Sequence, residues 1–162
     1  MTRFILPLIL LTSLISKHSV AQEETFDLVG IWQEDLPMIA SGWSTNYQFF
    51  EDGSVNYNHS QMDCGDSIIT ESGTYKFKNG KVKIRFKEVI FISGGELQKA
   101  SGSCGSEFEI VGGHLETKPL KRKVKLNIKK AEPLEDYDYL DRIIIDKVSW
   151  FRMARDPETY DQ

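Results

Sequence analysis

The sequence is poor in the residues from which metal and redox sites are built. It contains three histidines and two cysteines in 162 residues, and His59 and His114 are not placed at a ligand spacing. Zinc sites usually need three or four histidine, cysteine or carboxylate ligands, so we expect no metal ion and no cofactor. A Cys-x-x-Cys pair and the Gly-x-Ser-x-Gly pattern of esterases are also absent. The sequence therefore predicts a protein that is not an enzyme.

A long hydrophobic run is missing as well, except for a short one at the N-terminus. Arg3 supplies a positive charge, and Pro7 interrupts the mainly apolar run Phe4–Ile15. A membrane-spanning helix needs roughly 20 apolar residues, whereas a charged start, a short apolar run and small residues before a cut are typical of a secretory signal peptide. We expect cleavage near Ala21, which leaves residues 22–162 as one secreted or periplasmic domain that does not span a membrane.

The charge balance is mildly acidic. Twenty basic residues oppose 24 acidic ones, which gives a formal net charge of −4. Loss of Arg3 and Lys17 with the signal peptide makes the remainder more acidic by two charges. Such a surface repels a phosphate backbone, so no nucleic-acid partner is expected.

Cys64 and Cys104 both lie in the exported part of the chain. An even pair in an oxidising compartment is most often a disulfide. Joining two points about 40 residues apart should stabilise the fold by roughly 4 kcal/mol in the chain-entropy model. The sequence therefore predicts a structural disulfide in preference to a reactive thiol.

No segment of the exported part shows convincing helical periodicity. Apolar and charged residues alternate in Lys81–Lys87 and again in Lys123–Lys129, which is typical of strands with one buried face. The acidic segment Pro133–Leu140 lacks a good N-cap, so we expect a loop or at most one helical turn.

One hairpin can be placed in register at Asn79-Gly80, the residue pair that type I′ turns prefer. A two-residue loop there puts four apolar side chains on one face, in the pairs Phe77 with Val82 and Tyr75 with Ile84. The lysines between them then share the other face.

A second hairpin favours a three-residue loop at Glu51-Asp52-Gly53, with Gly53 in the left-handed conformation. That loop pairs Phe49 with Val55 and Tyr47 with Tyr57. A shorter loop would place Phe49 opposite Asn56 and break the apolar face.

Further strands complete an all-β fold. They are expected at Val29–Glu34, Val89–Ser93, Ser106–Val111 and Arg142–Met153. The apolar phase shifts near Asp146-Lys147, which suggests a β-bulge, and a similar shift lies between Phe86 and Val89. Seven to nine short strands predict an antiparallel up-and-down barrel of about eight strands, with a β-sandwich as the alternative.

Gly30-Ile31-Trp32 resembles the Gly-x-Trp opening of lipocalin-like proteins, and the aromatic strand and Asn-Gly hairpin that follow resemble small exported bacterial domains of that kind. The resemblance implies a barrel in which Trp32 closes one end and packs against an arginine from near the last strand. Arg152 is the best match for that arginine, and Arg142 is the second choice. An ordinary core role for Trp32 is the alternative.

The aromatic face predicts a candidate binding site in the interior. Its residues are Tyr47, Phe49, Tyr57, Tyr75, Phe77 and Phe86. A barrel of about eight strands either fills with side chains or leaves room for one small ligand. The first hypothesis is thus a binding protein for a small apolar or amphipathic ligand. The second is a protein-interaction or inhibitor module with a filled core, using the segments Cys64–Ser67 and Ser101–Ser106 to bind an extracytoplasmic protein.

Four other segments have a structural and a functional interpretation. The basic strand Lys121–Lys130 could bind polysaccharide or lipid headgroups, or could be a solvent face that discourages edge pairing. The acidic run Glu132–Asp141 is a solvated connection or a weak Ca²⁺ site. Gly65-Asp66-Ser67-Ile68 resembles a hydrolase block, but a turn beside a disulfide explains it better. Asn58-His59-Ser60 is a glycosylation sequon.

Overall fold

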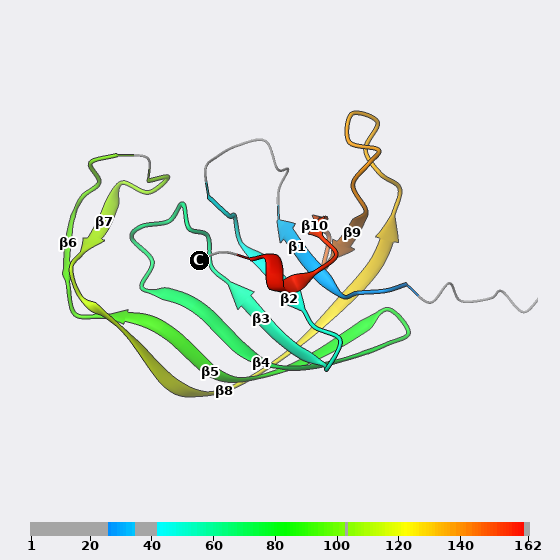
Figure 1. Ribbon diagram of the computed structural model, residues 1–162, viewed down its shortest axis with the longest axis horizontal. Coiled ribbons are helices and arrows are strands. Elements are labelled where there is room, and N and C mark those ends of the chain that lie inside the picture. The colour runs from blue at the N-terminus through cyan, green and yellow to red at the C-terminus, as the bar shows by residue number, and fades with distance from the viewer. Residues whose placement is uncertain (1–25, 35–41, 103, 161–162) are drawn as a thin grey trace, which may run out of the picture.

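The computed structural model describes residues 26–34, 42–102 and 104–160, and almost all regular structure in them is β-strand (Figure 1). The strands are β1 (Gly30–Glu34), β2 (Asn46–Phe49), β3 (Ser54–Asn58), β4 (Ile68–Lys78), β5 (Lys81–Ser93), β6 (Glu96–Lys99), β7 (Phe108–Val111), β8 (His114–Ala131), β9 (Arg142–Ile145) and β10 (Val148–Ala154). A single 3-10 turn, η1 (Pro157–Thr159), follows them. The predicted cleavage site near Ala21 lies outside the described residues.

Eight of the strands form one antiparallel sheet that closes on itself. The order around the ring is β1-β2-β3-β4-β5-β8-β9-β10, and β10 pairs with β1. Consecutive strands are neighbours, except that the β6–β7 hairpin is inserted between β5 and β8. The predicted all-β fold of about eight antiparallel strands is confirmed. The sandwich alternative is wrong, because every strand of the ring has two paired neighbours.

Both predicted hairpin registers are confirmed. Asn79 and Gly80 have φ angles of 51° and 67°, as a type I′ turn requires. Gly53 has a φ of 83° in the longer loop. The partners are Tyr75 with Ile84 and Phe77 with Val82 in the first hairpin, and Tyr47 with Tyr57 and Phe49 with Val55 in the second.

The predicted bulge at Asp146-Lys147 is wrong. These residues have φ angles of 46° and 83° and form the turn between β9 and β10, so the predicted strand Arg142–Met153 is a hairpin. The Asp146 carboxylate accepts hydrogen bonds from the backbone and side-chain nitrogens of Asn127, both at 3.0 Å. These bonds hold the turn against β8. An Asp-Lys pair is not a usual type I′ turn, so the sequence carried little sign of it.

The strands β5 and β8 are longer than predicted. The segments Lys81–Lys87 and Val89–Ser93 belong to one strand, and its register opposite β8 shifts between Phe86 and Glu88, where the apolar phase also shifts. The strand β6 and the first half of β8 were not predicted. In Figure 1, β5 and β8 continue to the left as far as the β6–β7 hairpin.

The predicted disulfide between Cys64 and Cys104 is confirmed, with Cα atoms 5.8 Å apart. It joins the β3–β4 connection to the loop between β6 and β7. Disulfides persist in oxidising compartments, which agrees with an extracytoplasmic setting. No helix among the described residues is long and apolar enough to cross a membrane.

Candidate functional site

The six aromatic residues predicted to form a binding site all lie in or against one core cluster inside the ring. Tyr47 is central, with ring centroids 5.4 Å from Phe49 and 4.7 Å from Tyr57. Tyr75 packs at 4.9 Å from Phe49. Phe77 contacts Phe26, with ring centroids 5.9 Å apart. Because these rings contact one another, they occupy much of the interior.

Trp32 lies at one end of this core and is fully buried. Its indole nitrogen donates to the carbonyl of Leu28 at 2.8 Å. The Arg152 guanidinium lies 4.6 Å from the Trp32 ring centroid and donates to the carbonyl of Asp27. Arg142, the second choice, instead bonds to Ser149 at 3.3 Å. The N-terminal segment and Arg152 thus cover Trp32 together.

Gly30 is required by the closing strand pair. Its φ is 126°, and a Cβ there would collide with the carbonyl oxygen of Ala154 on β10. A larger residue would push β1 away from β10, where the ring closes. This close approach gives the Gly-x-Trp motif a physical basis in this chain.

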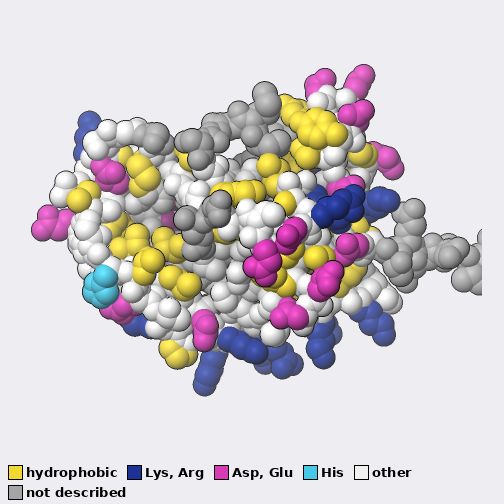
Figure 2. Space-filling model, viewed as in Figure 1, with side chains coloured by type: hydrophobic (Ala, Val, Ile, Leu, Met, Phe, Trp, Pro, Cys, Tyr) yellow, Lys and Arg dark blue, Asp and Glu magenta, His cyan; other side chains and the backbone are white. Residues whose placement is uncertain are grey.

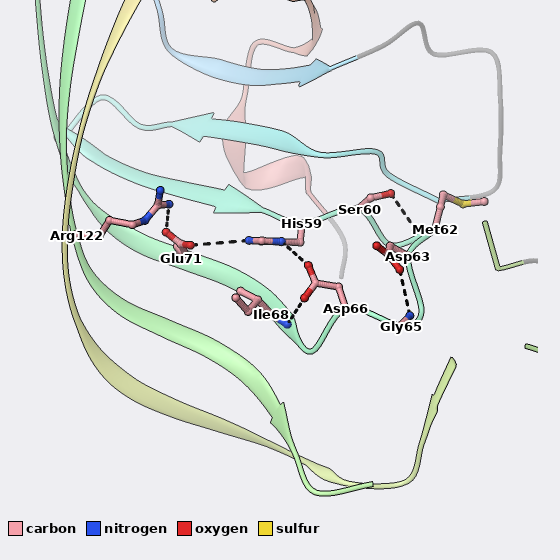
Figure 3. A network of polar contacts seen from close by, with 9 residues as sticks. All are labelled: His59, Ser60, Met62, Asp63, Gly65, Asp66, Ile68, Glu71 and Arg122. Carbon is pink, nitrogen blue, oxygen red and sulfur yellow. Dashed lines mark hydrogen bonds and ion pairs between the residues drawn. The ribbon is translucent and has the colours of Figure 1, made fainter. Parts of the chain in front are cut away.

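A polar cluster that the sequence did not reveal lies on the inner side of β3, β4 and β8 (Figure 3). We call it the polar layer and define it as His59, Asp66, Glu71 and Arg122. His59 Nδ1 lies 2.8 Å from Asp66 Oδ2, and His59 Nε2 lies 3.9 Å from Glu71 Oε1. The Arg122 guanidinium donates to the other Glu71 oxygen. The four side chains therefore form a continuous series of polar contacts from the β3–β4 connection through β4 to β8.

Arg122 faces inward although it lies in a strongly basic strand. It is opposite Phe86, and its guanidinium carbon is 4.4 Å from the Phe86 ring centroid. It continues the inward series of Val124 and Leu126 along β8, because residues two apart in a strand share a face. Glu71, only 8 % exposed, needs a positive partner at that depth. Arg122 therefore points to the inner side of the ring, unlike the neighbouring lysines, although its side chain stays 42 % exposed.

The polar layer adjoins an aromatic layer, defined here as Tyr47, Tyr57, Phe86 and Trp150. Ring centroids are 5.2 Å apart between Tyr47 and Trp150 and also between Tyr57 and His59. Burial raises the pKa of the Tyr47 and Tyr57 hydroxyls above the ordinary value. Both groups therefore stay neutral hydrogen-bonding groups at physiological pH.

Two buried nitrogens at this junction lack a hydrogen-bond partner within the described part of the chain, namely Trp150 Nε1 and His59 Nε2. Nearly all buried polar groups in proteins are satisfied, so each exception needs an explanation. An indole N–H can only donate. The Trp150 indole N–H therefore needs an acceptor atom from outside the described residues.

The polar layer consists of fixed charges and hydrogen bonds. The neighbours of His59 Nδ1 and Nε2 are carboxylates, and a search of the described ranges finds no cluster able to hold a metal ion. Asp66 also accepts the Ile68 amide at 2.9 Å, so the Gly-Asp-Ser segment forms a turn beside the disulfide. The layer can orient an ion or dipole through fixed charges.

The two segments proposed as an interaction surface are brought together by the disulfide. The Gly105 amide donates to the Met62 carbonyl at 2.7 Å, and the Ile110 amide donates to the Cys64 carbonyl at 2.8 Å. Phe108 and Leu97 next to them are 44 % and 63 % exposed. Cys64–Ser67 and Ser101–Ser106 thus share one region of the surface.

The remaining segments are placed as follows. β8 pairs with β5 over His114–Asn127 and with β9 only over Ile128–Ala131. Most of its lysines therefore lie beside a single paired strand, and edge protection stays a prediction. Pro133–Leu140 forms turns, with one bridge between Leu134 and Tyr137. Asn58 of the sequon is fully buried and donates to Asn46 and Gln48 at 2.9 and 2.8 Å, so it is not accessible to glycosylation in the folded state.

No protein-family model matches this sequence, and neither the curated proteins nor the solved structures include a match.

Proposed function

We propose that this chain is a non-enzymatic, exported binding protein that holds a small amphipathic ligand at the junction of its aromatic and polar layers. The apolar part of the ligand would lie against Tyr47, Tyr57 and Trp150. Its polar end would accept a hydrogen bond from the Trp150 indole and lie near Arg122. The observation that carries the proposal is the pair of buried, unpartnered nitrogens on Trp150 and His59.

The mutual packing of the deeper rings supports a site at this junction over one deep in the interior. Phe49 is fully buried and contacts both Tyr47 and Tyr75. A ligand there would have to displace close-packed side chains, which is costly. At the junction, in contrast, a ligand that brings an acceptor removes an existing penalty, because buried donors are expensive to leave unsatisfied.

The lipocalin-like assignment is part of the same proposal. It is supported by the closed ring of eight strands, by the glycine that permits β1 to approach β10, and by the contact between Trp32 and Arg152. Proteins of this architecture enclose one small ligand or fill with side chains. Either outcome is compatible with a role that involves no catalysis.

The proposal is tested by calorimetric titration with dodecanoate, an anionic amphiphile. The Trp150→Phe variant keeps an aromatic ring but removes the N–H donor. A hydrogen bond to a charged group contributes about 1.5–3 kcal/mol, so affinity should fall by about tenfold or more.

Trp43→Phe is the matched control, because Trp43 packs against Tyr160, 5.2 Å away, and not within the aromatic layer. It should bind like the unchanged protein. Equal affinities of the two variants would contradict the proposed site. Failure to bind dodecanoate, together with the absence of any co-purifying small molecule in native mass spectrometry, would contradict ligand binding itself.

The second candidate is the protein-interaction module, and one observation favours it. The disulfide holds two loops beside exposed Phe108 and Leu97, and exposed aromatic residues are common anchors of protein interfaces. A Phe108→Ser, Leu97→Ser variant should lose a partner that is recovered from the protein's own source. Unchanged recovery would remove the support for this surface.

A further inference from the structure

The strand register collects basic residues into a grid on the outer face of β4, β5 and β8. Lys76, Lys83 and Lys125 lie directly opposite one another in one row of three strands. Arg85 and Lys123 are paired in the row on one side of it, and Lys78 and Lys81 in the row on the other. We call these seven residues the basic face.

The direction of these side chains follows from alternation along each strand. Tyr75, Ile84 and Val124, which lie between the rows, belong to the hydrophobic core or pack against it. Adjacent residues in a strand point to opposite sides, so the seven basic side chains point away from the core. All seven are exposed. Figure 2 shows Lys and Arg side chains along the lower side of the molecule, where Figure 1 has β4, β5 and β8.

The basic face is not neutralised by the rest of the described chain. Within the described residues, none of the seven forms an ion pair with a carboxylate. Acidic side chains stand at its two ends, where Glu88 lies opposite Ser72 and Asp146 bonds to Asn127, and beside β4, where Asp52 bonds to Ser54 opposite Thr74. Because the chain carries a formal net charge of −4, the other surfaces must be strongly acidic. The basic face therefore concentrates seven positive charges, while eleven further Lys and Arg residues after position 22 lie elsewhere in the chain.

The composition of the face indicates what it can recognise. Six of its seven residues are lysines, which act as flexible point charges and not as the bidentate forks that arginines form with single phosphates. It has no aromatic side chain on which a nucleic-acid base could stack. A lysine grid on a sheet therefore suits an extended, negatively charged surface without fixed geometry.

Aliphatic side chains continue the same outer face along β5 and β8. Leu120 of β8 packs against the core, so by alternation Thr117 and Leu115 share the outer face with Lys123. Thr117 is opposite Ile90. Two residues further along β5, Ile92 is opposite Leu115, which is 66 % exposed. Aliphatic groups next to lysines suit the boundary between lipid headgroups and acyl chains, whereas an acidic polysaccharide offers them nothing to bury against. This pairing favours a lipid surface.

We propose that the basic face is a docking surface for an anionic lipid bilayer, to which the protein binds peripherally through its lysines and Leu115. The acidic remainder of the surface would then face away from the bilayer and fix the orientation. This surface lies outside the ring, so it is distinct from the ligand site proposed above and can be tested independently of it.

The test is co-sedimentation with vesicles of phosphatidylglycerol and phosphatidylcholine in equal amounts, and with pure phosphatidylcholine vesicles. Each basic residue near an anionic membrane contributes about 1 kcal/mol, so the K83Q/K125Q variant should partition about 30-fold more weakly. K99Q/R155Q removes the same charge from β6 and from the segment after β10 and should bind like the unchanged protein. The N-terminal segment is the same in every variant, so its contribution cancels.

Two readouts distinguish lipid from other polyanions. Binding should weaken steeply as salt is raised, and Leu115→Ser should reduce binding to vesicles without changing retention on a heparin column. Equal partitioning of the two double variants, or equal binding to phosphatidylcholine alone, would overturn the proposal. Retention on heparin that depends on Lys83 and Lys125, without any vesicle binding, would assign the face to a soluble polyanion instead.

Discussion

The buried hydroxyl group of Tyr47 makes the stability of the folded state depend on pH. Burial is the main cause that raises its pKa above the ordinary value of 10.0, and Tyr57 raises it further, while Arg122 lowers it. The folded state therefore retains a proton that the unfolded chain loses above pH about 10. The stabilisation that comes from this difference is fully present below that pH and is lost as the pH rises towards the folded-state pKa.

The Tyr47→Phe variant should consequently resist alkaline unfolding better than the unchanged protein. Phenylalanine keeps the ring contacts with Phe49, Tyr57 and Trp150 but has no group to ionise. We expect the alkaline midpoint, followed by circular dichroism, to move to higher pH. Tyr139→Phe is the control, because Tyr139 is 71 % exposed, and it should leave the midpoint in place. A midpoint that does not move in Tyr47→Phe would show that this hydroxyl is not what limits alkaline stability.

Individual residues were predictable from the sequence where their environment is local. Asn79 and Gly80 carry their turn preference in their own backbone, and the register of their hairpin followed from it. Arg122 and Glu71 are 51 positions apart and lie on β8 and β4, which meet only because both strands pair with β5. No spacing rule connects such residues, so the polar layer could not be found before the structure.

At the scale of the element, the long strands β5 and β8 depend on the disulfide between Cys64 and Cys104, which lies outside both strands. The halves of β5 and β8 next to the β6–β7 hairpin, and the hairpin itself, contain little buried apolar surface. All four residues of β6 are exposed. Sequence patterns indicate strands through alternating burial, and such a pattern is weak here. The disulfide therefore constrains the conformation of this region, where burial of apolar side chains contributes little.

Replacing both cysteines, in the Cys64→Ser, Cys104→Ser variant, should thus loosen this region first. The bond closes a separation of 40 residues, and its loss should lower the free energy of unfolding by up to about 4 kcal/mol. Hydrogen exchange should accelerate at the Gly105 and Ile110 amides, which bond across the two loops. The Tyr75 amide, which bonds to Gly53 at 2.8 Å within the ring, provides the internal reference. Equal acceleration at all three amides would mean that the disulfide supports the whole ring and not one region.

At the scale of the whole molecule, the segregation of charge conflicts with stability. Like charges directly opposite in a sheet repel each other, and Lys83 has Lys76 on one side and Lys125 on the other. The chain also has 24 acidic residues, so a mixed distribution was available to this composition. Repulsion between these lysines in the free protein is understandable if binding to an anionic partner neutralises their charge.

The Lys83→Glu variant should therefore be more stable than the unchanged protein while binding anionic vesicles less well. The substitution replaces two repulsive cross-strand pairs by two attractive ones, for which we expect a gain of about 1 kcal/mol at low salt. The gain should shrink as salt is added, because screening weakens interactions between exposed charges. Lys99→Glu serves as the control, since β6 pairs only with β7 and Lys99 lies opposite Phe108. Urea unfolding at two salt concentrations measures the effect. A Lys83→Glu protein that is less stable than the control at low salt would show that the lysine row does not destabilise the fold, and the conflict between charge and stability would disappear.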